Sequence, residues 1–141
     1  MDINQPIHLY LSNEETYESG EIIIEEGTKD NWVYIILEGQ AKVTKRTDAG
    51  IIRVDKLKKG AIFGEMALLG KVQGGRSEFV IAADGAIRVG VLNLQQLLRD
   101  YESLSPDLRS LITTLILKLE ESNEKIVAFV AAANQKDSAE V

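Results

Sequence analysis

The 141-residue sequence has no cysteine, a single histidine, two prolines and no long apolar run. Without cysteine there are no disulfides and no thiolate chemistry, and this composition fits a reducing compartment. A membrane-spanning helix needs about 20 consecutive apolar residues, and the sequence has no such run. The first residues also lack the basic and apolar segments of a secretory signal. We therefore expect a cytoplasmic protein without a membrane anchor.

The single histidine, His8, precedes the predicted strands. Metal sites that use several histidines are therefore excluded, and so are nucleophile–histidine pairs beyond this one residue. We predict no metal, no cofactor and no enzymatic activity.

Positive charge is also scarce, since the net charge is −6. Nucleic acids and anionic membranes attract basic surfaces, so neither is an expected partner. An anionic ligand has to bind where cations and backbone N–H groups are concentrated locally.

The segment from Gly20 to Leu92 has the pattern of short strands separated by turns. Apolar and β-branched runs occur at 22–24, 32–37, 41–45, 51–57, 78–82 and 86–92. The turn sequences Asp48-Ala49-Gly50 and Asp84-Gly85 each predict a hairpin. The pattern predicts a mainly β (α+β) fold, an antiparallel β-roll or jelly-roll barrel over about residues 14–92.

Two helices are predicted after the strands, at about 93–133. Asn93 is a favourable N-cap for a short helix to about Tyr101. Ser105-Pro106-Asp107 has the signals of a second helix start. Neither glycine nor proline follows up to about Ala133, which predicts one long helix. The length fits a single domain, 1–141.

The long helix has a seam of residues spaced alternately by four and three. The seam consists of Leu108, Ile112, Leu115, Leu119, Ser122, Ile126, Phe129 and Ala133. Such a heptad seam favours a partner helix and predicts a homodimer. The alternative is that the seam packs on the roll of its own subunit. A second stripe is available for that packing: Leu104, Leu111, Ile116, Val127 and Val130.

The segment that carries the ligand chemistry is 60–69, GAIFGEMALL, followed by Arg76-Ser77. Gly64 permits a sharp turn, and residues 66–69 can form one helical turn with free N–H groups. Together with the Arg76 guanidinium, these groups make an anion site. Glu65 beside an anion fits a ligand that also offers a hydroxyl donor, such as a ribose 2′-OH.

This segment resembles the phosphate-binding cassette of the cyclic nucleotide-binding domain family, especially the bacterial catabolite activator branch. Gly27, the segment 34–39 and Lys59-Gly60 match the family as well. The resemblance implies a β-roll flanked by helices, with the ligand between the roll and the long helix.

The resemblance also implies a role for each site residue. Arg76 and Ser77 bind the cyclic phosphate, with backbone N–H groups from Gly64 and Ala67, and Glu65 accepts from the ribose hydroxyl. Ser122 of one subunit and Asn123 of the other contact the base, which favours cyclic AMP.

Two departures from the family pattern concern the same site. The loop from Glu65 to Arg76 is slightly longer than usual. Glu78 stands where family members generally carry a small residue. Residues 76 and 78 of a strand point to the same face, so Glu78 is expected either to repel the ligand or to pair with Arg76.

The sequence thus predicts a non-enzymatic sensor of cyclic AMP that signals to an unidentified downstream protein by repositioning its C-terminal helix. The alternative is a ligand-free interaction and dimerisation module of the same fold. The DNA-binding domain of the activator branch does not follow the long helix, so direct DNA binding is not expected. The chain is expected to be either a stand-alone module, which the Met1 start and the polar tail favour, or a fragment of a longer protein.

Overall fold

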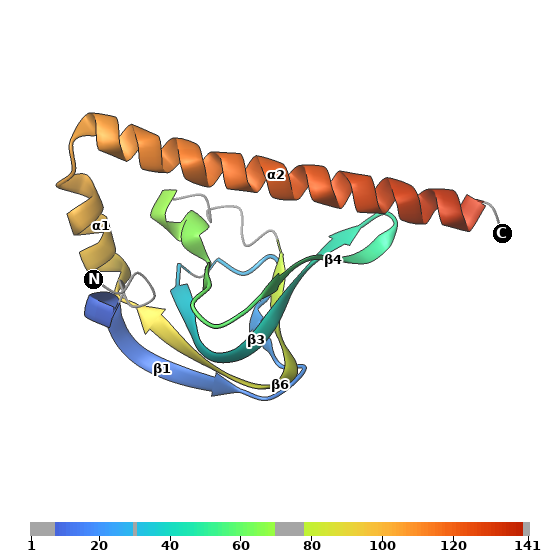
Figure 1. Ribbon diagram of the computed structural model, residues 1–141, viewed down its shortest axis with the longest axis horizontal. Helices are drawn as coiled ribbons and strands as arrows, with labels where there is room; N and C mark the ends of the chain where they lie inside the picture. The colour runs from blue at the N-terminus through green and yellow to red at the C-terminus, as the bar shows by residue number, and fades with distance from the viewer. Residues whose placement is uncertain (1–7, 30, 70–77, 140–141) are drawn as a thin grey trace.

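The computed structural model describes residues 8–29, 31–69 and 78–139. The chain forms an antiparallel roll followed by two helices, which confirms the predicted fold class (Figure 1). The strands are β1 (Leu11–Tyr17), β2 (Ile22–Ile24), β3 (Val33–Thr47), β4 (Gly50–Leu57), β5 (Ile62–Phe63) and β6 (Phe79–Leu92). The helical elements are the 3₁₀ turns η1 (His8–Tyr10) and η2 (Glu65–Leu69) and the helices α1 (Leu94–Glu102) and α2 (Pro106–Ala139).

The sheet is organised around β3 and β6. The strand order is β1-β6-β3-β4, β2 also pairs with β6, and β5 also pairs with β3. The hairpin predicted at Asp48-Ala49-Gly50 is confirmed, because Thr47 pairs with Gly50 where β3 meets β4. Strand β1, which begins before the first predicted strand, forms one edge of the sheet.

The hairpin predicted at Asp84-Gly85 is wrong, because β6 continues through these residues as one strand. Asp84 and Gly85 both have positive φ, 60° and 123°. The register against β3 passes from the pair Glu38–Arg88 to the pair Gln40–Ala83. Residues 84–87 therefore bulge from β6 opposite Gly39, and both long strands bend at this point instead of reversing.

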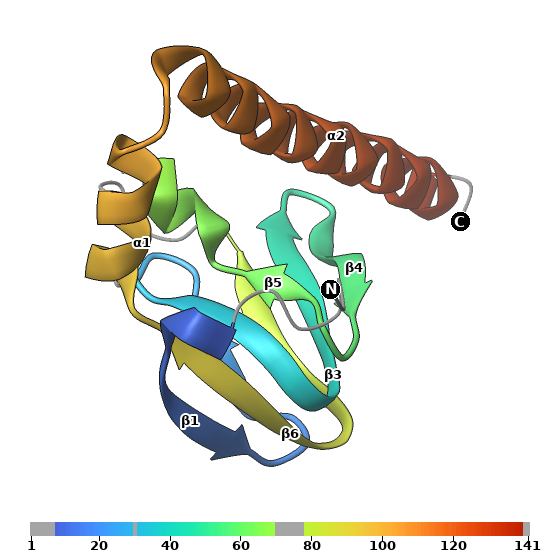
Figure 2. The same ribbon diagram turned by 60° about the vertical axis from the view of Figure 1, so that its left-hand side comes forward.

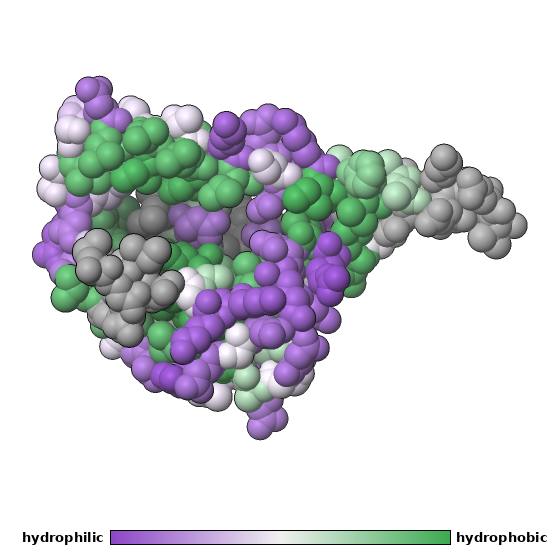
Figure 3. Space-filling model, viewed as in Figure 1, coloured by the Kyte–Doolittle hydropathy of each residue, from purple (hydrophilic) through white to green (hydrophobic). Residues whose placement is uncertain are grey.

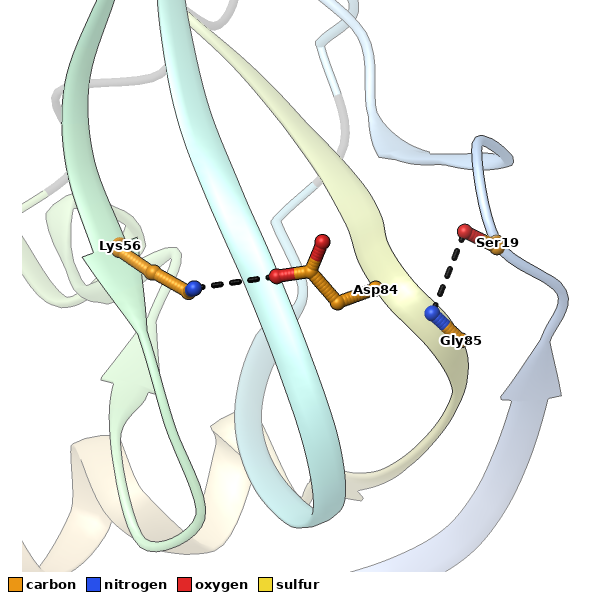
Figure 4. A network of polar contacts seen from close by, with 4 residues as sticks. All are labelled: Ser19, Lys56, Asp84 and Gly85. Atoms are coloured by element: carbon orange, nitrogen blue, oxygen red, sulfur yellow. Dashed lines mark hydrogen bonds and ion pairs between the residues drawn. The ribbon is translucent and has the colours of Figure 1, made fainter.

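Polar contacts join the bulge to β4 and to the turn that follows β1 (Figure 4). The Lys56 ammonium lies 3.0 Å from an Asp84 carboxylate oxygen, and the Gly85 N–H donates to the Ser19 hydroxyl at 3.3 Å. Both ionic side chains are exposed, so this pair contributes at most about 1 kcal/mol to stability.

The core fills the inside of the roll. Ile36, Val80, Ile87 and Val89 are almost completely buried there. The rings of Tyr34 and Phe63 stack with their centroids 4.9 Å apart, which joins β3 to β5 directly before η2.

Both helix starts lie where the sequence predicts them. The Asn93 side chain accepts from the Gln96 N–H at 3.1 Å, and the Ser105 hydroxyl accepts from the Leu108 N–H at 3.2 Å. The Tyr101 hydroxyl, 2.6 Å from the Thr113 hydroxyl, joins α1 to α2.

Helix α2 lies across the open side of the roll and continues to Ala139 (Figures 1 and 2). No helix in the described ranges is long and apolar enough to cross a membrane.

Helix α2 turns one stripe toward the roll and leaves most of the heptad seam exposed, although the seam residue Ile112 is half-buried. Ile116, Val127 and Val130 are half-buried, as expected for the stripe that faces the roll. Leu111, which the sequence analysis assigned to the same stripe, is exposed. The exposed apolar residues of the seam are Leu108, Leu115, Leu119, Ile126 and Phe129. Because these side chains are exposed, packing on its own roll does not account for the seam. Figure 3 shows apolar residues over parts of α2.

Candidate functional site

A pocket lies where η2, the β3–β4 hairpin and α2 meet. The described residues that line it are Lys45, Val54, Glu65, Met66, Glu78, Glu120, Asn123, Glu124 and Val127. Figure 3 shows the surface hollowed between α2 and the roll. Segments far apart in the sequence, the cassette and the long helix, thus meet at one site.

The roll side of the pocket is built by Gly64 and η2. Gly64 has a φ of 79°, which an L side chain rarely adopts, and this sharp turn directs the chain from β5 into η2. Glu65, the first residue of η2, is half-buried and lines the pocket. Ala67 is buried, and its N–H donates to the Gly64 carbonyl at 3.2 Å. Donation from Ala67 to a phosphate therefore requires that bond to be shared or broken.

The helix side of the pocket contains one of the two predicted base contacts. Asn123 is half-buried and lines the pocket. Ser122 is exposed, lies on the heptad seam and is not among the described lining residues. Within one subunit, Glu65 and Asn123 are thus brought together, and Ser122 is not.

Arg76 and Ser77 lie outside the described residues, as does the loop that contains Gly74 and Gly75. Their roles at the phosphate stay predictions. Glu78 is described, half-buried and part of the pocket wall, where a carboxylate acts on any ligand bound beside η2.

The described lining is strongly acidic. It contains four carboxylates, Glu65, Glu78, Glu120 and Glu124, and one ammonium group, that of Lys45. At neutral pH these five groups sum to 1 − 4 = −3. Like charges about 4 Å apart repel by roughly 1–4 kcal/mol depending on solvent access. An anion binds here only beside a strong local cation, which is the part predicted for Arg76.

The sequence analysis missed Lys45, Glu120 and Glu124 as pocket residues. Glu120 and Glu124 are one helical turn apart, and Asn123 and Val127 share their side of α2, so this stripe was readable from the spacing. Lys45 comes from the far part of β3. The position of Lys45 beside the pocket depends on how β3 bends, and the sequence has no local signal for that bend.

The pocket is small for a nucleotide. Its volume is about 60 Å³, whereas small-molecule sites usually measure roughly 300–1,000 Å³. Larger hollows lie at the α1–α2 corner beside Arg109 and next to Trp32, but neither is lined by cassette residues. A nucleotide therefore enters the pocket beside η2 only if α2 or the lining side chains move.

No group of three or more histidine or carboxylate side chains in the described ranges is arranged to hold a metal ion. The described lining of the pocket offers carboxylates, one ammonium group and one carboxamide.

A family model described as "Cyclic nucleotide-binding domain" matches residues 14–103. Over 80 residues, the chain is 32% identical to a cAMP-dependent protein kinase regulatory subunit of Mycosarcoma maydis, covering 57% of this chain and 15% of that protein. Over 104 residues, it is 35% identical to a cGMP-dependent protein kinase of Caenorhabditis elegans, covering 69% of this chain and 13% of that protein. The chain thus spans a small part of these relatives.

Solved structures give the same result for the fold. The EAL enzyme Bd1971, in its form with cAMP and cyclic-di-GMP bound, has a TM-score of 0.69 at 27% identity, covering 91% of this chain and 34% of that one. The catabolite activator protein of Thermus thermophilus has a TM-score of 0.63 at 22% identity, covering 84% of this chain and 55% of that one. The second likeness concerns the fold alone.

Proposed function

Because the chain belongs to the cyclic nucleotide-binding domain family, we propose that it is a non-enzymatic regulatory module that binds a cyclic nucleotide between η2 and α2. The observation that carries this proposal is the convergence of Glu65 from the cassette and Asn123 from α2 on one pocket. In the complex, Arg76 and Ser77 bind the cyclic phosphate, and Glu65 accepts a hydrogen bond from the ribose hydroxyl.

The module signals through the position of α2. This helix forms one wall of a pocket of about 60 Å³, so the ligand favours a conformation in which α2 sits differently on the roll. A ligand shifts such an equilibrium by its differential affinity for the two conformations. The response is read by an unidentified downstream protein that contacts α2.

Cyclic AMP is the ligand that the match at Ser122 and Asn123 favours. The carboxamide of Asn123 both donates and accepts, which suits the mixed hydrogen-bonding edge of adenine. Ser122 supports this choice less, since its exposed position requires a second subunit to bring it to a base.

A homodimer through α2 is part of the proposal. The seam residues Leu108, Leu115, Leu119, Ile126 and Phe129 are exposed along one side of the helix. A second copy of the same helix buries such a seam, with Ser122 as its polar position.

The second candidate is a ligand-free module of the same fold. The four carboxylates around a small pocket favour it, because they oppose an anionic ligand. Mass spectrometry of nucleotide released from the purified protein, together with titrations of cyclic AMP and cyclic GMP, separates the two candidates. A protein that carries and binds no nucleotide is the ligand-free module.

Arg76→Ala is expected to weaken cyclic nucleotide binding about 10- to 150-fold, as measured by isothermal titration calorimetry. Charge-assisted hydrogen bonds contribute about 1.5–3 kcal/mol each, and Arg76 is the cation assigned to the phosphate. The acidic lining has no other cation among its described residues except Lys45.

Glu78→Ala is expected to change the affinity in the opposite direction in the same titration. It removes one of the four pocket carboxylates, so binding is expected to tighten. Equal affinity of wild type and Arg76→Ala would show that Arg76 does not bind the ligand. Unchanged or weaker binding by Glu78→Ala would show that this carboxylate does not compete with the ligand.

A further inference from the structure

Positive charge is concentrated in one part of the roll. Residues 40–60 form the end of β3, the hairpin, β4 and the turn that follows it (Figure 2). They contain seven lysine and arginine side chains and two aspartates, so this segment carries +5 in a chain of −6. Lys45 is the one cation of the segment that the described lining of the pocket includes. The other six lie elsewhere on the surface.

Four of these cations share one face of the sheet. Lys42 lies directly opposite Lys56, and Thr44 lies directly opposite Arg53. Paired residues of antiparallel strands share a face, and alternate residues along a strand, here 42, 44 and 46, point the same way. The basic face therefore consists of Lys42, Arg46, Arg53 and Lys56, and all four are exposed.

Three of the four cations have no counter-charge. Lys56 pairs with Asp84 at 3.0 Å, but Lys42, Arg46 and Arg53 form no ion pair with any residue that the structure describes. Like charges directly opposite each other on a sheet are destabilising, as they are for Lys42 and Lys56. A negatively charged partner relieves this repulsion.

Protection of the sheet edge does not account for the whole basic face. Strand β4 ends the order β1-β6-β3-β4, and charged side chains on such an edge discourage pairing with another chain. Arg53 and Lys56 fit that role. Lys42 does not, because it lies on β3 and is paired with Ile81 of β6 on its other side. A partner that binds the face accounts for the cations of both strands.

An apolar strip borders the basic face. Ile81 lies opposite both Lys42 and Ile22, and Phe79 lies opposite Thr44, so these side chains share the face. Ile22 is 47% exposed, and Phe79 and Ile81 are half-buried. The surface thus suits a partner that combines carboxylates with apolar side chains, which a nucleic-acid backbone does not offer.

We infer that the basic face and its apolar border dock an acidic, partly apolar peptide segment of a partner protein. Lys42 and Arg46 are four residues apart on one strand, about 13 Å, which four or five extended residues of a peptide span. The face is on the side of the hairpin opposite to Lys45, so this surface is separate from the pocket and the inference goes beyond the proposed function.

The charge of the rest of the chain favours a short segment over a larger polyanion. Outside residues 40–60 the chain carries −11, the difference between −6 and +5. Charges are screened beyond about 8 Å at physiological salt, so a short acidic segment on the basic face interacts mainly with that face. A nucleic acid or an anionic membrane extends past the face toward the acidic remainder, which repels it.

The test uses a fluorescein-labelled octapeptide of alternating glutamate and valine, titrated with the intact chain and followed by fluorescence anisotropy. Alternation places the carboxylates about 7 Å apart on one side of the extended peptide and the valines on the other. We expect saturable binding at low ionic strength that weakens as salt is added.

The variant Lys42→Gln/Arg46→Gln/Arg53→Gln is expected to bind this peptide about 10-fold more weakly, because each exposed charge pair contributes modestly and three are removed. The three side chains are exposed and do not belong to the described lining of the pocket. Binding of cyclic nucleotide by this variant is therefore expected to match the wild type.

The matched control is Lys29→Gln/Arg99→Gln/Lys118→Gln, which removes the same charge from exposed positions elsewhere. It is expected to bind the peptide like the wild type. No peptide binding by the wild type at low salt, or equal weakening in the two triple variants, overturns the inference.

Vesicles of phosphatidylserine and phosphatidylcholine and a single-stranded oligonucleotide are titrated in the same way. Tighter binding of either than of the peptide overturns the assignment to a peptide segment. A chain that binds the peptide through the basic face and binds no cyclic nucleotide supports this inference, while the proposed function fails.

Discussion

Leu119→Glu is expected to weaken self-association of the chain by about 100-fold or more. Leu119 lies in the middle of the heptad seam, and 61% of its surface is exposed in the single chain. A leucine buried at an interface contributes about 1.5–3 kcal/mol, and a symmetric dimer loses two of them. The substitution also sets two carboxylates close together, while glutamate keeps a high helix propensity.

Sedimentation equilibrium over a range of concentrations measures this effect. The matched control is Leu117→Glu, because Leu117 is an exposed leucine of the same helix, at 39%, but lies about 200° around it from Leu119. The control is expected to associate like the wild type. A wild-type chain that stays monomeric at high concentration, or an equal loss in both variants, contradicts the dimer.

The helix starts were predictable because their signals are local. Asn93 and Ser105 each accept a backbone N–H three residues ahead, and such capping depends on a few neighbouring residues only. The long uninterrupted stretch after Pro106 likewise determines α2, apart from its end.

The path of the chain through Asp84 and Gly85 was not predictable in the same way. These residue types signal that the backbone takes positive φ, and both do. Positive φ serves a hairpin turn and a bulge equally well. Which one forms depends on the pairing with β3, and that strand is remote in sequence.

The candidate site likewise combines residues that local motifs predict with a residue that only the tertiary fold brings to the pocket. Glu65 and Asn123 were found because each belongs to a contiguous motif, and both line the pocket. Lys45 reaches it from β3 only because two bent strands bring the β3–β4 hairpin under α2. The electrostatic character of the site, acidic on both walls, is therefore a property of the tertiary fold.

Gly39→Ala is expected to lower the free energy of unfolding by about 3 kcal/mol or more. Gly39 has a φ of 92°, which for a residue with a side chain costs roughly 1–3 kcal/mol. An added Cβ would also lie 2.6 Å from the Ala86 carbonyl oxygen and 2.9 Å from Ile87 Cα. Both are backbone atoms of the β6 bulge, so no side-chain rotation relieves the contact.

Gly27→Ala is the matched control for this measurement by urea denaturation. Gly27 has nearly the same φ, 88°, but a Cβ there meets nothing within 4 Å. Its cost is therefore the backbone strain alone, and the difference between the two variants isolates the contact with the bulge. Equal losses would mean that the bulge yields at little cost. A larger loss at Gly39 means that close approach of β3 and β6 fixes the bend, and through it the hairpin under the ligand pocket.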